Sequence, residues 1–280
     1  FEQWSARVLG EINLKGLEEK FAFVDLCTGW GIAEDEAFIG TKILQAAAED
    51  KALASMLSMI LNEKEPNKAV RFANDLEEIP LVVNMGFPPQ LFCSEIDAKV
   101  LSALSLVKNL PTFLMMDIWN YQGADLNLLR QLVKNNGCDC LLIFDCQSIS
   151  NAVLKPKKEA DMLRIFSKKA SQELQLKFKE KIPAFQKEQL ILNSFKNLIQ
   201  QKLGSTLPAP LHYKFYDEKN KTSHFIFFVS QNQSNYSLMR EILSEESQII
   251  EDGIGKLEFN PNLGEQQRIT SQTLFGAMFE

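Results

Sequence analysis

Apolar runs alternate with helix-like segments along the first half of this chain. Nearly continuous apolar runs that end in polar residues are typical of parallel strands covered on both faces. The predicted strands cover residues 20–27, 56–62, one of 79–83 and 90–93, 110–116 and 140–144. The segments between them have helical spacing, and one helix is expected through 43–53, after Gly40-Thr41, and another after Pro66, which starts a helix well. Strands that alternate with helices indicate a mainly parallel sheet.

The pattern changes after residue 145. Residues 156–203 have helical spacing and no strand signal, and two helices separated near 181–183 are expected. Two apolar runs at 211–216 and 224–230, joined by a polar turn, read as a hairpin. A helix is expected from Ser237, and the tail after Phe259 has little periodicity. The hairpin adds one antiparallel strand to the sheet.

These patterns divide the chain into three parts of a Rossmann-like α/β fold. Residues 1–154 are predicted to form a cofactor-binding core, and residues 155–205 a basic helical insertion. Residues 206–280 are predicted to supply the strands and helix that complete the sheet.

The charge is distributed unevenly. The net charge of −6 argues against a generally basic nucleic-acid binder, yet residues 155–202 carry twelve Lys and Arg against five Asp and Glu. Such a segment could bind nucleic-acid phosphates, and it could equally be a solvated helical face, since Lys and Glu are good helix formers.

Membrane and metal chemistry receive no support. No apolar run approaches the roughly 20 residues of a membrane helix, so no membrane association and a cytoplasmic location are expected. The cysteines are expected to be buried free thiols rather than disulfides. Cys138 and Cys140 form a C-x-C pair without a second Cys or His pair, so no metal site is expected.

The most specific chemical signal is the turn after the first strand. The apolar run 21–24 leads into Asp25 and then into Gly29-Trp30-Gly31. Glycines without a Cβ let a backbone approach a ligand closely, as in nucleotide sites of Rossmann-like folds. The acidic loop 34–36 would repel a diphosphate, so the sulfonium of S-adenosylmethionine fits better than NAD, which is kept as an alternative.

Two later strand ends carry further carboxylates. Glu63 could accept both ribose hydroxyls of a nucleoside cofactor, or could form with Glu65 a carboxylate pair at a helix start. Asp117 ends the fourth strand, where a substrate amine would meet the cofactor. Asp145 ends the fifth strand and is either a ligand or a structural cap.

In this order the motifs resemble the three-Cys-motif partner family (TcmP), which is class I methyltransferase-like. The family's D-x-[FY]-[AS]-G-x-G turn is similar to Asp25-Leu-Cys-Thr-Gly-Trp-Gly31, and its E-K-D-P strand end to Glu63-Lys-Glu-Pro66. Its D-P-F-G-Y motif aligns with Asp117-Ile-Trp-Asn-Tyr121. The resemblance spans most of residues 3–245. It implies an S-adenosylmethionine pocket that includes Asp25, Gly29, Trp30, Gly31 and Glu63.

The fourth motif lacks the family's proline and glycine. By resemblance, Asp117 and Asn120 would lie at a target amine, and Trp119 or Tyr121 would stack on an extruded base. The two rings could instead be packing residues. The resemblance therefore implies an S-adenosylmethionine-dependent methyltransferase acting on nucleic acid, on an exocyclic amine, with a defence-associated role. The alternative is a catalytically inactive module that works with a partner protein. A nicotinamide-dependent oxidoreductase is the third hypothesis.

Overall fold

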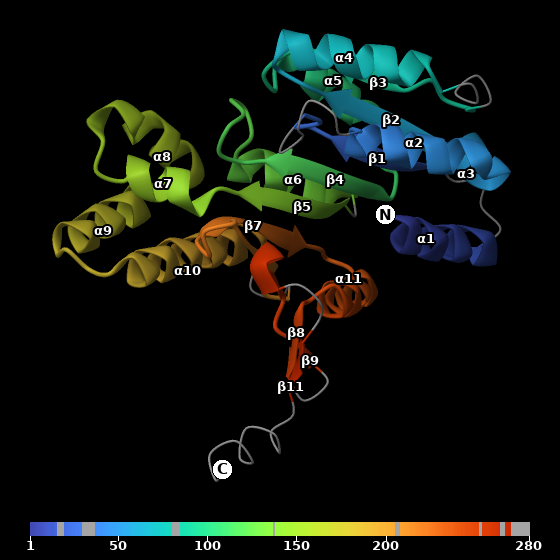
Figure 1. Ribbon diagram of the computed structural model, residues 1–280. Coiled ribbons are helices and arrows are strands. Elements are labelled where there is room, and N and C mark those ends of the chain that lie inside the picture. The colour runs from blue at the N-terminus through green and yellow to red at the C-terminus, as the bar shows by residue number, and fades with distance from the viewer. Residues whose placement is uncertain are drawn as a thin grey trace. The chain divides into compact units, whose positions relative to one another are not determined.

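The computed structural model describes residues 1–15, 20–29, 37–79, 85–136, 138–204, 208–251, 254–263 and 267–269. Two compact units are present, residues 1–142 and residues 143–280. A mostly parallel sheet of eight strands, flanked by helices, makes the protein an α/β protein with a Rossmann-like fold (Figure 1). This confirms the predicted fold class.

The first unit contains most of the parallel part of the sheet, and β10 and β6 of the second unit also pair parallel. Its strands are β1 (Phe21–Asp25), β2 (Leu57–Asn62), β3 (Gln90–Phe92), β4 (Thr112–Asp117) and most of β5 (Cys138–Phe144). Its helices are α1 (Glu2–Lys15), α2 (Ile39–Glu49), α3 (Lys51–Met56), α4 (Pro66–Glu77), α5 (Ala98–Leu106) and α6 (Leu126–Asn136). Of the two candidates for the third strand, residues 90–92 form β3, and residues 80–83 of the other lie outside the described residues.

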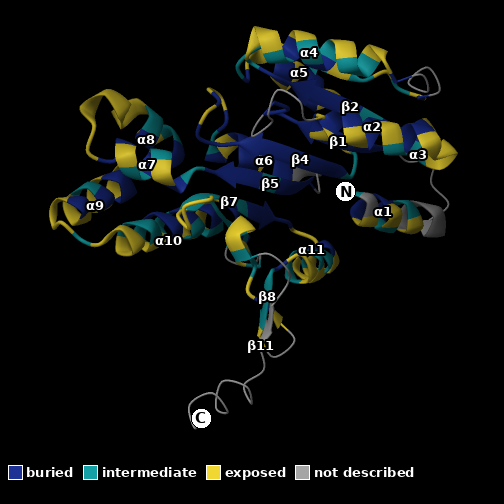
Figure 2. Cartoon of the chain, viewed as in Figure 1, coloured by how far each residue is buried: buried dark blue, intermediate teal, exposed yellow. Residues whose placement is uncertain are grey.

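Burial explains why the strand predictions for this unit succeed. Every residue of β1 and β4 is buried, so both strands read as continuous apolar runs (Figure 2). The expected single helix through 43–53 is wrong, because α2 ends at Glu49 and Asp50 starts a new helix. The Asp50 side chain accepts hydrogen bonds from the backbone N–H groups of Ala52 and Leu53, as an N-cap does.

Strand order creates a switch point beside β1. The order in the sheet is β10-β6-β7-β5-β4-β1-β2-β3, so β1 lies between β2 and β4 and is parallel to both. The chain runs outward from β1 to β3 and then returns to place β4 on the other side of β1. Parallel α/β sheets bind ligands at the carboxyl ends of the strands on either side of such a point.

The second unit combines helices with the hairpin. Its helices are α7 (Cys146–Ala152), η2 (Pro156–Lys158), α8 (Glu159–Ile165), α9 (Lys168–Lys179), α10 (Ala184–Leu203), α11 (Gln233–Glu245) and η3 (Pro261–Leu263). Its strands are β6 (Leu211–Tyr216), β7 (Thr222–Val229), β8 (Ile249–Glu251), β9 (Ile254–Gly255), β10 (Glu258–Phe259) and β11 (Gln267–Ile269). β6 and β7 pair antiparallel, which confirms the hairpin.

Local capping corrects two predictions in this unit. Residues 156–203 form three α-helices rather than two, since Ser167 ends the first stretch and caps α9 through the Ala170 N–H. The predicted break near 181–183 is confirmed. The last helix starts before Ser237, because Asn232 caps the Ser234 and Asn235 N–H groups. The short strands β8, β9 and β10, which precede the tail, were not predicted, and neither was β11 in the weakly periodic tail after Phe259.

Aromatic side chains form much of the second unit's core. Phe144 stacks on Phe195 of α10 with ring centroids 4.3 Å apart, and both rings pack edge-on against Phe227 of β7. Figure 2 shows the outer faces of α9 and α10 as largely exposed by contrast.

All five cysteines are free thiols, as predicted. Cys93 is exposed, so the expected burial is wrong for this residue, which follows the short, half-buried strand β3. Within the described part of the chain, none of the helices has the length and apolar character that crossing a membrane requires.

Candidate functional site

Three buried carboxylates stand at the carboxyl ends of neighbouring strands. Asp25 ends β1, Glu63 follows β2 and Asp117 ends β4, and each is only 1% exposed. Because β1, β2 and β4 are parallel, these side chains are at one edge of the sheet, around the switch point. Buried carboxylates need hydrogen-bond partners, so their surroundings decide what each can do.

Glu63 joins three segments of the chain. Its Oε2 accepts a hydrogen bond from the Gly29 N–H at 2.7 Å. Its Oε1 accepts from the Glu65 N–H at 2.8 Å and from the Tyr121 hydroxyl at 3.2 Å. Glu63 therefore connects the glycine turn, the start of α4 and the turn after β4, which the sequence had predicted only as separate motifs.

Gly29 packs directly on Glu63. A Cβ at Gly29 would lie 2.2 Å from Glu63 Oε2 and 2.8 Å from Lys68 Cδ. The glycine is thus required by a close approach of this chain's own carboxylate. Trp30 and Gly31, the other residues predicted for this turn, lie outside the described residues, as does the acidic loop 34–36.

Asp25 organises the first part of the same turn. Its carboxylate accepts the Cys27 N–H at 3.0 Å. Burial raises the pKa of Asp25 to about 6, and the neighbouring Glu63 carboxylate adds to the rise. Burial also raises the pKa of the Cys27 thiol, and Asp25 and Asp117 raise it further. Cys27 is therefore an inert buried thiol rather than a nucleophile.

Asp117 holds the turn that carries the predicted catalytic residues. One carboxylate oxygen accepts the N–H groups of Trp119 and Asn120, each at 2.9 Å, and the other accepts Asn120 Nδ2 at 2.7 Å. Trp119 and Tyr121 are both buried. Side-chain capping by Asp117 thus shapes this turn without the proline and glycine of the D-P-F-G-Y motif.

Two lysines border the cluster, and sequence reasoning did not identify them. Lys64 Nζ contacts the Asn120 carbonyl and lies 4.8 Å from the centre of the Tyr121 ring. Lys68 Nζ lies 3.3 Å from the Gly29 carbonyl oxygen. Both lysines follow Glu63 closely in the sequence. The pattern that could have identified them is a pair of basic residues, one and five positions after the predicted ribose carboxylate.

Asn62 adds an acceptor that no described residue satisfies. Its Nδ2 donates to the Ser94 carbonyl at 3.0 Å and to the Leu26 carbonyl at 3.4 Å, and the residue is fully buried. Among the described residues, none donates a hydrogen bond to its Oδ1. Buried acceptors are normally satisfied, so a ligand N–H or O–H would complement this atom.

The hydrogen-bond acceptors of this cluster fit an adenosyl ligand in part. A carboxylate offers about four acceptor positions, and the described residues use three on Glu63. One position on Glu63 and the Asn62 Oδ1 could therefore serve a nucleoside if they become accessible to it, since Glu63 is 1% exposed and Asn62 is fully buried. Asp145, the other candidate ligand, caps α7 by accepting the Ser148 N–H at 2.8 Å, which supports the structural alternative.

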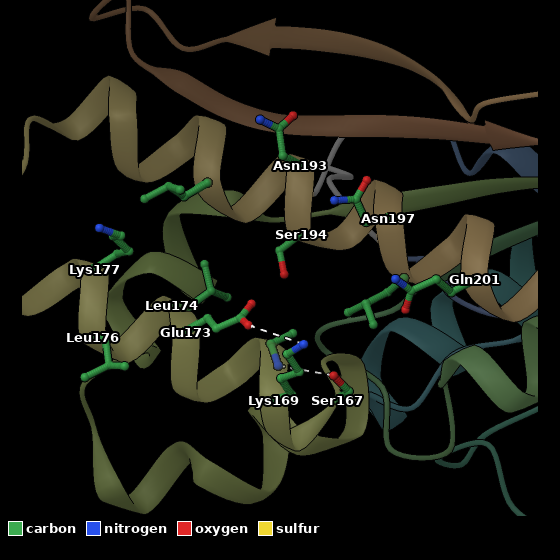
Figure 3. A pocket seen from close by; sticks show the side chains of 13 residues that line it. Ser167, Lys169, Glu173, Leu174, Leu176, Lys177, Asn193, Ser194, Asn197 and Gln201 are labelled. Atoms are coloured by element: carbon green, nitrogen blue, oxygen red, sulfur yellow. Dashed lines mark hydrogen bonds and ion pairs between the residues drawn. The ribbon is translucent and has the colours of Figure 1, made fainter.

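The second unit has a groove of about 540 Å³ between α9 and α10 (Figure 3). Leu174 and Leu176 of α9 and Leu190 and Leu198 of α10 give it an apolar lining. Its polar side chains include Asn193, Ser194, Asn197 and Gln201 along α10 and the Lys169–Glu173 ion pair on α9. The groove lies within the basic segment 155–202.

Comparison of the chain with family models gives no match, and comparison with curated proteins gives none either.

Proposed function

We propose that this protein binds S-adenosylmethionine at the strand-end cluster of its first unit, which is formed by Asp25, Glu63 and Asp117. We propose further that it is a class I methyltransferase-like member of the TcmP family. The observation that carries the proposal is the set of buried carboxylates around the β1–β4 switch point, together with the neighbouring residue Asn62, whose Oδ1 has no donor among the described residues. Parallel α/β sheets bind nucleoside ligands at this position.

Each residue has a defined role in this proposal. Glu63 accepts a ribose hydroxyl, and Asn62 offers its free oxygen to a ligand N–H or O–H. The backbone of Asp25 and Gly29 would border the cofactor, and Trp30 and Gly31, which lie outside the described residues, are proposed to belong to the same pocket because they continue the glycine turn in sequence. Bound S-adenosylmethionine supplies an electrophilic methyl group on a sulfonium, and the buried carboxylates favour a positive ligand over a diphosphate.

The proposed methyl acceptor is an exocyclic amine of a nucleic acid, in a cytoplasmic and defence-associated setting. Asp117 and Asn120 would orient the amine, and Trp119 or Tyr121 would stack on the base. Stacking requires these buried rings to become accessible to the base. Lysines of residues 155–202 would contact phosphates.

Calorimetric titration tests the cofactor proposal. Wild type is expected to bind S-adenosylmethionine, and Glu63→Gln to bind at least about tenfold more weakly, because an amide replaces one acceptor by a donor. Glu65→Gln is the matched control, since this neighbouring side chain contacts Lys68 on the surface. Wild type that does not bind would refute the proposal, as would tighter binding of NADH in competition.

A second function is a non-catalytic module that works with a partner protein. The groove between α9 and α10 favours it, because an apolar lining with a polar rim suits an amphipathic helix. Leu176 of α9 and Phe185 of α10 are each more than half exposed and extend the apolar surface of these helices.

Methyl transfer distinguishes the two functions. Protein loaded with radiolabelled S-adenosylmethionine should label DNA or RNA if the first holds, and Asp117→Ala should abolish the labelling. Binding without labelling of DNA, RNA or protein, together with an unchanged cellular function of Asp117→Ala, would select the module.

A further inference from the structure

Glu63 has fewer free acceptor positions than a ribose needs. A ribose presents two adjacent hydroxyl donors, whereas three of the roughly four positions on Glu63 are already used. Binding both hydroxyls to this carboxylate therefore requires one of the chain's own hydrogen bonds to break.

The three bonds differ in how easily they can be released. Gly29 and Glu65 donate backbone N–H groups at 2.7 and 2.8 Å, and moving either would change the glycine turn or the start of α4. Tyr121 donates a side-chain hydroxyl at 3.2 Å, the longest of the three distances. Exchange of a phenol hydroxyl for a ribose hydroxyl also conserves the number of bonds to Glu63.

We propose that Tyr121 sets the affinity of this site by competing with a ribose hydroxyl for Glu63 Oε1. The inference rests on the proposed function. Lys64 opposes release of the ring, because its Nζ lies over the Tyr121 ring and contacts the Asn120 carbonyl. Tyr121 follows the turn built by Asp117, so ribose binding would be coupled to that turn.

Titration of S-adenosylmethionine into wild type, Tyr121→Phe and Tyr213→Phe tests this inference. Tyr121→Phe should bind about tenfold tighter, the equivalent of one hydrogen bond that no longer has to be exchanged. Tyr213→Phe is the matched control: its hydroxyl donates to the carbonyls of Glu246 and Glu258 in the second unit, and its affinity should equal that of wild type.

The outcomes separate the two claims. Wild type that binds, with Tyr121→Phe binding equally or more weakly, would overturn the inference and leave the proposed function intact. Absence of binding by all three proteins would overturn both. Fluorine NMR of protein that contains fluorotyrosine tests the inference without measuring affinity. The Tyr121 resonance is assigned by its loss in Tyr121→Phe, and it should shift when S-adenosylmethionine is added. An unshifted resonance in the bound protein would also overturn the inference.

Discussion

The strand-end cluster and the basic helical segment differ in how deeply their charged side chains are buried. At the strand ends, few carboxylates are present, yet Asp25, Glu63 and Asp117 are almost fully buried and accept hydrogen bonds from the chain. In residues 155–202 many charges are exposed, and pairs such as Lys177–Glu180 lie one helical turn apart on the surface. Exposed pairs contribute little to stability, whereas a buried carboxylate orders several segments at once. Burial, not the number of charges, therefore indicates which region controls the fold.

The largest expected effect is at Glu63. Glu63→Ala would leave the Gly29 N–H, the Glu65 N–H and the Tyr121 hydroxyl without their acceptor. Each unsatisfied buried group costs about 1–3 kcal/mol, so the buried Gly29 and Tyr121 donors alone give an expected loss of about 2–6 kcal/mol in urea unfolding, and the part-buried Glu65 N–H adds less. Glu65→Ala, which removes an exposed side chain, should change stability by less than about 1 kcal/mol. Equal losses of unfolding free energy in Glu63→Ala and Glu65→Ala would show that burial does not separate the two carboxylates.

Gly29 allows a matched pair of glycine substitutions. Gly29→Ala places a Cβ against Glu63 and Lys68 and is expected to cost about 1–3 kcal/mol. Gly10→Ala in α1 meets nothing within 4 Å and should stabilise the protein by up to about 1 kcal/mol. Thermal unfolding of both variants measures the difference. A stabilised Gly29→Ala would mean that the glycine turn is not packed on Glu63.

Asp25 predicts a pH dependence of the first unit. Its pKa rises from 3.8 to about 6 in the folded protein. The stability that the protonated Asp25 side chain contributes is therefore fully present below pH 3.8 and is lost as the pH rises through 6. Asp25→Asn cannot ionise, and its stability relative to wild type should increase by about 2 kcal/mol from pH 4.5 to pH 8. Denaturant unfolding at the two pH values tests this. Asp97→Asn is a contrast: hydrogen bonds lower the pKa of Asp97 below 3.8, so the stability that its carboxylate contributes is lost only as the pH falls below that value, and the stability of this variant relative to wild type should be nearly the same at pH 4.5 and pH 8.

His212 predicts the opposite pH dependence for the second unit. Burial, with the nearby Lys196 and Lys214, lowers its pKa from 6.5 to about 4. The stability that this neutral side chain contributes is therefore present above pH 6.5 and is lost as the pH falls toward 4. Because His212 is partly exposed, a loss of only about 1 kcal/mol is expected. His212→Gln should remove most of this loss in unfolding measured at pH 7 and pH 4.5.

The smallest effect is expected on the helical surface. Lys177→Ala breaks the 3.1 Å contact with Glu180, in which both side chains are about half exposed, and should cost less than about 0.5 kcal/mol. Measurement in 0.5 M salt should reduce the difference further. A cost comparable to that of Glu63→Ala would show that the helical segment depends on its charges as the strand ends do.

Local signals explain which predictions succeeded. The strands β1, β2 and β4 were predictable because buried parallel strands leave long apolar runs. The break in α2–α3 at Asp50 and the break at Ser167 were missed because capping residues also occur inside helices and on loops. The short strands β8 and β9 have too few residues to give a period.

The sequence by itself determined the α/β alternation, the hairpin and the positions of Asp25, Glu63 and Asp117 at strand ends. Apolar periodicity and turn residues are local properties, so they can be read along the chain. Only the tertiary structure decided that Glu63 bonds Gly29 and Tyr121, which lie 34 and 58 residues away. Strand order and side-chain packing create those contacts, and neither leaves a trace in residues that are adjacent in sequence.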